Sequence, residues 1–271
     1  MNIHLDTVRS TNSWLLDSLA DGNDWEDMSV VWTMRQTAGR GQVGNSWEAE
    51  EDKNISFSVL LKPTFLHPRE QFSISEITAL AVRHAVDDEL NISEAIAGTS
   101  DTGETRGNAC ISVKWPNDVY AGDEKVAGIL IENRLQGCVM SHCVLGIGIN
   151  VNQMKWVGNA PNPTSLRLLS GHEHNPQHVM ERVVEYIGRY YDALRNNPDE
   201  AKAAIHDEFC RNVYRRNGFF PYKDAQSGET FEAEISGIEP TGPMHLKLQG
   251  GEERTYSFKE VRYVLAWGDR E

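Results

Sequence analysis

The chain of 271 residues lacks long apolar runs and is short of positive charge. No segment approaches the roughly 20 consecutive apolar residues that a membrane-spanning helix needs. The first residues show no basic segment followed by an apolar one, so no secretory signal is predicted. Lys and Arg number 26 against 40 Asp and Glu, which gives a formal charge of −14. Proteins that bind a nucleic-acid backbone are usually basic, so we expect neither a membrane nor a nucleic acid as partner.

Cysteines are also few, and their spacing excludes two kinds of site. The chain has four: Cys110, Cys138, Cys143 and Cys210. They form no CxxC pair, which argues against a disulfide framework and against a zinc site of the usual spacing. Free thiols are typical of a reducing compartment. Together with the missing signal, this predicts a cytoplasmic protein.

The apolar periodicity predicts an α+β fold with two domains. Helical spacing is expected over 11–19, 72–90, 177–195 and 198–209, and strands over 29–34, 55–61, 111–114, 126–133 and 138–149. The polar, glycine-bearing segment 91–108 is expected to be an exposed loop. After residue 218 only short strand-like runs remain, separated by turns, as in a small β-barrel. We therefore expect a mixed α/β domain at 1–218 and a β domain at 219–271.

One loop is suited to an anion. The segment 36–47 reads QTAGRGQVGNSW and places Arg40 between Gly39 and Gly41. Glycines let the backbone approach a ligand closely, and a guanidinium offers a fork of donors to carboxylate or phosphate. The loop is neither a P-loop nor a dinucleotide-binding motif. Taken alone, it is better explained as a flexible surface loop.

The loop is accompanied by further motifs, and their combination is specific. Ser10-Thr11-Asn12 precedes it, and three segments follow it in order: KWPND (114–118), KVAGILIE (125–132) and GIGINVN (146–152). In this order and spacing the motifs resemble those of the biotin–protein ligases, over about residues 3–265. The resemblance implies a mixed-sheet catalytic domain of the class II synthetase-like, biotin–lipoate ligase type, followed by an SH3-like β-barrel. It implies the short form without an N-terminal DNA-binding domain, because the first ligand motif begins at Ser10.

The same resemblance implies an activity and site residues. The family makes biotinyl-5′-adenylate from biotin and MgATP and transfers biotin to a lysine of a biotin carboxyl carrier domain. The positions that match biotin contacts are Ser10, Thr11, Asn12 and Gln36. The positions that match the loop closing over carboxylate and phosphate are Gly39, Arg40, Gly41 and Gln42. The positions that match the adenine side, the phosphates and the nucleotide are Trp47, Lys114, Asn117, Asp118, Lys125, Gly128 and Asn150.

The chemistry explains why cations are needed. The carboxylate of biotin and the α-phosphate of ATP are both anions, so their approach is unfavourable unless positive charge lies between them. Arg40, Lys114, Lys125 and Mg²⁺ would supply that charge, with Asp118 as the candidate magnesium ligand. The family loop is often richer in arginine than this one, which has Gln42, Val43 and Asn45. A weaker hold on the adenylate, or a dependence on other groups, is therefore expected.

Two other functions stay open at this stage. A lipoate–protein ligase or octanoyl transferase would have a related core, but an apolar tunnel suits its substrate better than Ser10-Thr11-Asn12. The transferase would also need an activated cysteine. A non-catalytic biotin-binding regulator would not need Lys114, Asp118 and Lys125. The sequence leaves open whether the protein is a monomer or a homodimer, and which carboxylase supplies the carrier domain.

Overall fold

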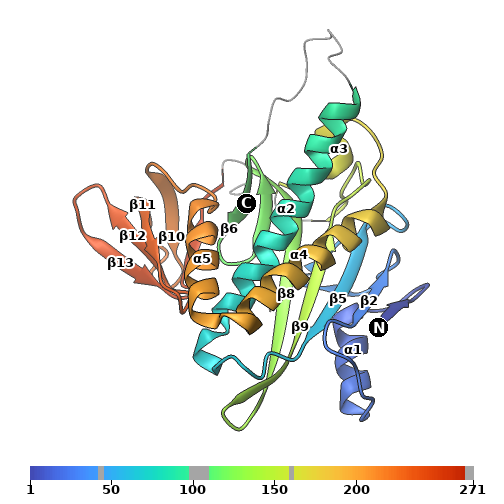
Figure 1. Ribbon diagram of the computed structural model, residues 1–271. Helices are drawn as coiled ribbons and strands as arrows, with labels where there is room; N and C mark the ends of the chain where they lie inside the picture. Colours follow the sequence, from blue (N-terminus) through green and yellow to red (C-terminus); the bar gives the residue numbers. More distant parts are fainter. Residues whose placement is uncertain (42–45, 98–109, 159–161, 266–271) are drawn as a thin grey trace.

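A seven-stranded mixed sheet forms the centre of the computed structural model, which describes residues 1–41, 46–97, 110–158 and 162–265 (Figure 1). Its order is β1-β2-β5-β9-β8-β7-β6. The strands are β1 (Asn2–His4), β2 (Val30–Thr33), β5 (Ile55–Leu61), β6 (Ile111–Lys114), β7 (Asp118–Ala121), β8 (Glu124–Gln136) and β9 (Val139–Ile149). β1 runs parallel to β2, and the other neighbours are antiparallel. The mixed sheet confirms the predicted α+β class.

A second, antiparallel sheet follows in the chain and lies to one side of the first in Figure 1. Its order is β13-β12-β11-β10-β14. The strands are β10 (Phe220–Asp224), β11 (Thr230–Ile238), β12 (Met244–Leu248), β13 (Glu253–Tyr256) and β14 (Val261–Tyr263). A small C-terminal β structure agrees with the sequence pattern. The SH3-like assignment and the domain boundary at residue 218 stay predictions.

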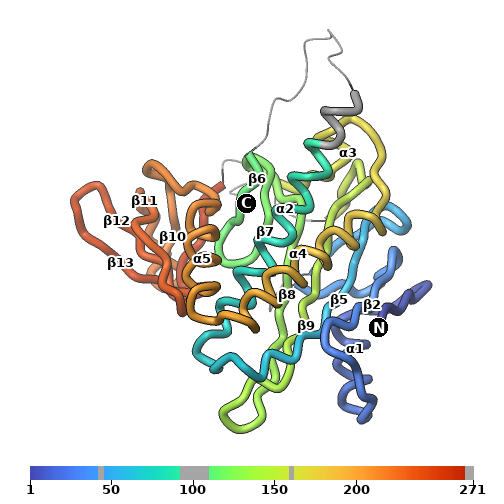
Figure 2. The backbone as a smooth tube through the Cα atoms, in the orientation of Figure 1, coloured from blue at the N-terminus to red at the C-terminus, as the bar shows by residue number. Residues whose placement is uncertain are grey.

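Helices cover both faces of the main sheet (Figure 2). On one face lie α2 (Phe72–Ala97), α4 (Pro176–Asn196) and α5 (Pro198–Arg211), and on the other lies α1 (Thr11–Ala20). A short α3 (Leu166–Ser170), a 3-10 helix at Pro68–Glu70 and a small hairpin of β3 (Gly39–Arg40) and β4 (Ser46–Trp47) complete the elements. Among the described residues, no helix is long and apolar enough to cross a membrane.

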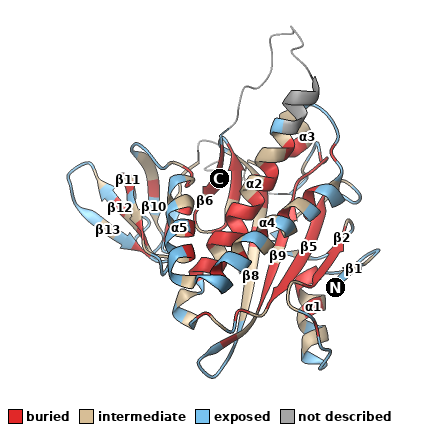
Figure 3. Cartoon of the chain, in the orientation of Figure 1, coloured by how far each residue is buried: buried red, intermediate tan, exposed pale blue. Residues whose placement is uncertain are grey.

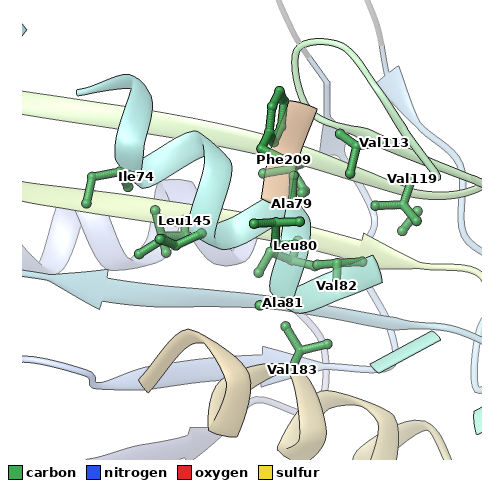
Figure 4. Packing of buried hydrophobic residues seen from close by; sticks show 14 of the residues in the cluster. Ile74, Ala79, Leu80, Ala81, Val82, Val113, Val119, Leu145, Val183 and Phe209 are labelled. Carbon is green, nitrogen blue, oxygen red and sulfur yellow. The ribbon is translucent and has the colours of Figure 1, made fainter. Parts of the chain in front are cut away.

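Strand alternation divides the core between the two faces, because successive side chains of a strand point in opposite directions. Val59 and Leu145 belong to the large cluster beneath α2, α4 and α5, whereas Leu60 and Val144 pack with Leu15 of α1. Figure 3 shows the buried strands between the helices, and Figure 4 shows side chains of α2 packing on those of β6, β7 and β9. The face beneath α1 holds the smaller apolar cluster, so part of that face is not covered by apolar packing.

A buried ion pair ties α5 to α2 and to the C-terminal sheet. His206 Nδ1 lies 2.6 Å from Glu76 Oε1, and His206 Nε2 lies 3.0 Å from the carbonyl oxygen of Ile238. Hydrogen bonds with Cys210 and Glu76 raise the pKa of His206 to about 10. The imidazolium therefore donates in two directions and compensates the charge of Glu76, whose side chain is almost fully buried.

The structure corrects the element predictions in two places. The expected loop at 91–108 is wrong for residues 91–97, which continue α2, and residues 98–109 lie outside the described part of the chain. The expected loop at 36–47 contains the hairpin of β3 and β4. Their two-residue strands are too short to produce a readable alternation.

Candidate active site

A pocket opens on the α1 face of the main sheet, where β5, β9 and β8 carry small residues. Ser56 pairs with Gly148 and Ser58 with Gly146, and Gly148 in turn pairs with Gly128. These positions share one face because they alternate with Phe57, Ile147 and the other core residues along each strand. Serine and glycine at these positions leave the space that larger side chains would fill.

The N-terminus of α1 supplies the polar end of the pocket. Ser10 caps this helix and accepts a hydrogen bond from the Ser13 N–H. The Thr11 N–H donates to Gln36 Oε1 at 3.0 Å, and Ser58 Oγ lies 2.8 Å from Thr11 Oγ1. These buried donors and acceptors hold one another in place, so the wall can present polar groups to a ligand without rearranging.

Asn12 is fixed with particular firmness. Its Nδ2 donates to the Leu130 carbonyl oxygen and to Glu132 Oε2, at 3.2 and 2.9 Å, and its Oδ1 lies 2.5 Å from Ser58 Oγ. A Cβ atom at Gly146 would lie 2.5 Å from Asn12 Oδ1. Glycine at that position is therefore what lets Asn12 reach across β9 to β8.

The indole of Trp47 lies against two glycines of the floor. A Cβ atom at Gly148 would lie 2.4 Å from the ring, and one at Gly128 would lie 2.9 Å from it. Gly39 pairs with Trp47, and a Cβ atom there would meet the Trp47 carbonyl oxygen at 2.5 Å. The three glycines thus permit the position of the indole, and its buried Nε1 has no hydrogen-bond partner among the described residues.

Two cations line the pocket, and each is paired with a carboxylate. Arg40 Nη2 lies 2.6 Å from Glu132 Oε2, and Lys125 Nζ lies 2.8 Å from Asp118 Oδ1. The Lys125 ammonium also lies 5.8 Å from the centre of the Trp47 ring. A guanidinium has five N–H donors and an ammonium three, so both groups retain donors for an anionic ligand.

Most of the residues predicted from the motifs meet at this pocket. Those that line it are Ser10, Thr11, Asn12, Gln36, Arg40, Gly41, Trp47, Asp118, Lys125 and Gly128. They come from the N-terminal end of α1, from Gln36 and the β3–β4 hairpin that follows it, and from β7 and β8. Gln42 lies outside the described residues.

Four other predicted residues do not line the pocket, and one of them, Gly39, pairs with Trp47 as described above. Lys114 Nζ lies over the rings of Tyr120 and Tyr263, at 5.4 and 5.0 Å, and burial lowers its pKa. Asn117 Nδ2 donates to the Ile129 carbonyl oxygen at 2.7 Å. Asn150 is buried, and its Oδ1 has no hydrogen-bond partner among the described residues. The expected contact of Lys114 with phosphate stays a prediction.

Sequence reasoning missed several residues of the site, and three of them have clear roles. Ser56 lines the pocket, Ser58 supports the side chains of α1, and Glu132 bridges Arg40 and Asn12. The two serines had a readable signal, because small residues alternate with large apolar ones in the strand ISFSVLL. Glu132 ends the KVAGILIE motif, but the motif does not show its role, since its contacts depend on how α1 and the β3–β4 hairpin lie over β8.

The comparisons agree with this geometry. Residues 5–150 match the model of the biotin/lipoate A/B protein ligase family. The bifunctional ligase/repressor BirA of Bacillus subtilis is 30% identical over 262 residues, covering 94% of this chain and 72% of that one. A biotin–[acetyl-CoA-carboxylase] ligase of Mycobacterium tuberculosis is 33% identical over 144 residues, or 53% of this chain and 47% of that one.

The fold has counterparts among solved structures. The biotin protein ligase of Aquifex aeolicus, solved in complex with biotin and ATP, superposes with a TM-score of 0.71 at 22% identity. The match covers 97% of this chain and 99% of that one. The matched region 5–150 contains α1, the arginine loop and all the site residues predicted from the motifs, and the chain belongs to the biotin/lipoate A/B protein ligase family.

Proposed function

We propose that this protein is a biotin–protein ligase, which activates biotin with MgATP and transfers it to a lysine of a biotin carboxyl carrier domain. The observation that carries the proposal is the meeting of Arg40 and Lys125 in one pocket with the polar end of α1. The relatives and solved structures named for biotin ligation support it.

Biotin would lie along the floor of the pocket. Its ureido ring has one carbonyl acceptor and two N–H donors, and the wall of Ser10, Thr11, Asn12, Gln36 and Ser56 offers both donors and acceptors. Such a wall suits a polar ring better than the acyl chain of octanoate or the dithiolane of lipoate. The valerate carboxylate would point toward Arg40 and Lys125.

The first step would join the two anionic substrates. The biotin carboxylate attacks the α-phosphorus of ATP, the bond to the bridging oxygen breaks, and pyrophosphate leaves with the electron pair. Arg40 and Lys125 would stabilise the charge that builds up on the phosphate oxygens, since both are fixed beforehand by their carboxylate partners. Trp47, which lies against the glycine floor and near the Lys125 ammonium, would pack on the adenine side.

Magnesium would enter as part of the MgATP substrate. Asp118 is the carboxylate that lines the pocket, and its Oδ1 is engaged by Lys125 at 2.8 Å. Within the described ranges no three His, Cys, Asp or Glu side chains gather as a metal site. The ion would therefore be held chiefly by phosphate oxygens, with Asp118 as its protein partner.

The second step would pass biotin to the carrier. The neutral amine of the acceptor lysine attacks the acyl carbon of the adenylate, the amine loses a proton, and AMP leaves. Arg40 and Lys125 would again stabilise the departing phosphate. No side chain of the protein forms a bond to biotin in either step.

The direct test is incubation with biotin, MgATP and a recombinant carrier domain, followed by mass spectrometry of the carrier. We expect one biotinyl group per carrier, and none when ATP is omitted or when the acceptor lysine is replaced by arginine. Biotin-dependent ATP–pyrophosphate exchange without carrier would support the adenylate. An unmodified carrier would refute the proposal, and a lipoyl group added from lipoate instead would favour the other branch of the family.

A further inference from the structure

Glu132 makes contacts that the motif roles do not explain. It ends the KVAGILIE segment on β8 and does not itself line the pocket. One of its oxygens, Oε2, accepts two hydrogen bonds, from Arg40 Nη2 at 2.6 Å and from Asn12 Nδ2 at 2.9 Å. The ion pair with Arg40 keeps this oxygen in the position from which it engages Asn12.

The contact with Glu132 fixes the direction of the Asn12 side-chain amide. Asn12 Nδ2 faces two groups that can only accept, the Glu132 carboxylate and the Leu130 carbonyl oxygen at 3.2 Å. Turning the amide over would bring Asn12 Oδ1 against both of these oxygens. Both N–H groups of Asn12 are therefore engaged inside the protein. This side chain lines the pocket, and it can offer a ligand only the remaining acceptor capacity of Oδ1.

The fixed amide also sets the direction of the neighbouring hydrogen bonds. Ser58 Oγ lies 2.5 Å from Asn12 Oδ1, and since Oδ1 has no proton, the single hydroxyl proton of Ser58 lies between them. The 2.8 Å contact between Ser58 and Thr11 then uses the proton of Thr11, which leaves Thr11 Oγ1 with lone pairs only. Gln36 Oε1 accepts from the Thr11 N–H at 3.0 Å, so the Nε2 end of Gln36 is the donor. The wall thus has acceptors at Asn12 and Thr11 and a donor at Gln36.

We propose that Glu132 is a positioning residue that determines which ring the pocket accepts, because it fixes Asn12 and its neighbours as hydrogen-bond acceptors. The inference rests on the proposed ligase function. A ureido ring carries two N–H donors and one carbonyl acceptor, and these complement two acceptors and one donor. A ring of the same shape with an oxygen in place of an N–H would bring lone pairs against a fixed acceptor, and that buried acceptor would stay unpaired.

The test compares biotin with two cyclic carbamates of the same shape, in each of which an oxygen replaces one N–H of the ring. Calorimetry gives the Kd of each ligand, and the larger ratio of carbamate Kd to biotin Kd is the ring selectivity. We expect a ring selectivity of at least about tenfold for the unmodified protein, as for a buried acceptor left without its donor.

Two substitutions of Glu132 separate its acceptor oxygen from its charge. Glu132→Met leaves only the longer bond to Leu130 to oppose the turned amide, so the ring selectivity should fall below about threefold. Glu132→Gln keeps an oxygen that can accept from Asn12, so it should retain the ring selectivity although the charge beside Arg40 is lost. Glu229→Met is the matched control, because Glu229 also pairs with an arginine, Arg254, at 3.1 Å and does not line the pocket.

The ratio distinguishes positioning from a merely structural role. A loosened pocket would weaken biotin and the carbamates alike and leave the ring selectivity unchanged, and this result in Glu132→Met would overturn the proposal. An equal loss in Glu132→Gln would do the same, since it would assign the effect to the charge.

Hydrogen exchange of side-chain amides, followed by NMR, supplies a measurement on the unmodified protein. Both Nδ2 protons of Asn12 should exchange with solvent more slowly than the Nε2 protons of Gln36, because both are bonded within the protein. Equal exchange would also count against the proposal. An unmodified protein that does not bind biotin would instead overturn the ligase function itself.

Discussion

Replacing Lys125 by methionine tests the electrostatic basis of the proposed reaction. The substitution keeps much of the apolar stem and removes the ammonium group. The variant keeps the backbone hydrogen bonds that residue 125 makes with Asn162 and Thr164, since these involve main-chain atoms. Its lost ion pair is partly exposed, with 22% and 24% of the two side chains accessible. The fold should therefore lose no more than about 1 kcal/mol.

The effect on catalysis should be much larger. A unit charge about 4 Å from a phosphate oxygen is worth about 4 kcal/mol at an effective dielectric constant of about 20, which suits a partly buried site. Since about 1.4 kcal/mol corresponds to tenfold in rate, kcat/KM for adenylate formation should fall about 1000-fold. Asp118 would also be left unpaired beside the reacting anions, which adds to the loss.

Biotin-dependent ATP–pyrophosphate exchange measures this step without the carrier. Lys62→Met is the matched control, because Lys62 also pairs with an aspartate, Asp24, at 3.3 Å and does not line the pocket. The control should exchange at the unmodified rate. A Lys125→Met protein that folds normally and exchanges within about threefold of that rate would refute the reasoning, because so small a loss is far below the 1000-fold expected.

Three further predictions test other parts of the structure. Gly148→Ala should weaken biotin binding, measured by calorimetric titration, about tenfold, because the added methyl group would lie 2.4 Å from the Trp47 indole. Gly250→Ala is the control: nothing lies within 4 Å of the added atom, so this variant should bind biotin normally in the same titration. His206→Gln should lower the melting temperature most below pH 6.5: the folded-state pKa is raised to about 10, so the charged histidine contributes fully at low pH and its contribution is lost as pH rises through 10. A difference in melting temperature that stays constant from pH 6 to pH 10.5 would contradict that origin. Asp118→Ala should flatten the dependence of exchange on Mg²⁺ concentration, and an unchanged magnesium titration would argue against its assignment.

The main elements of the fold were predictable because their apolar patterns are long. The strand predicted at 55–61 and the helices near 177–195 and 198–209 match β5, α4 and α5 closely. The missed elements are short or carry atypical residues. β7 begins at Asp118, the last residue of the polar KWPND segment, and β10 begins Phe-Pro, where proline indicates an edge position or a break.

Most of the predicted residues meet at the pocket, and they could be named because they lie in recognisable motifs. The serines and glycines that form the floor of the pocket were only partly predictable. Alternation in ISFSVLL and in GIGIN places serines and glycines on one face of each strand. Only the register that pairs Ser56 with Gly148, and Ser58 with Gly146, brings the two sets together beneath α1. Strand register depends on the whole sheet, and no local spacing encodes it.

The pairing of charges in the pocket is the feature of the site that the sequence did not predict. Motifs identify Arg40 and Lys125 as cations and suggest a positive pocket in an acidic protein. The structure places both cations at one pocket, yet each is paired there, with Glu132 and Asp118. A site that is proposed to hold two anionic substrates together benefits from such pairing, because buried or half-buried cations without partners would be costly to keep in place before substrate arrives. The carboxylates thus keep Arg40 and Lys125 oriented. A substrate anion can then bind the N–H donors that the carboxylates leave free.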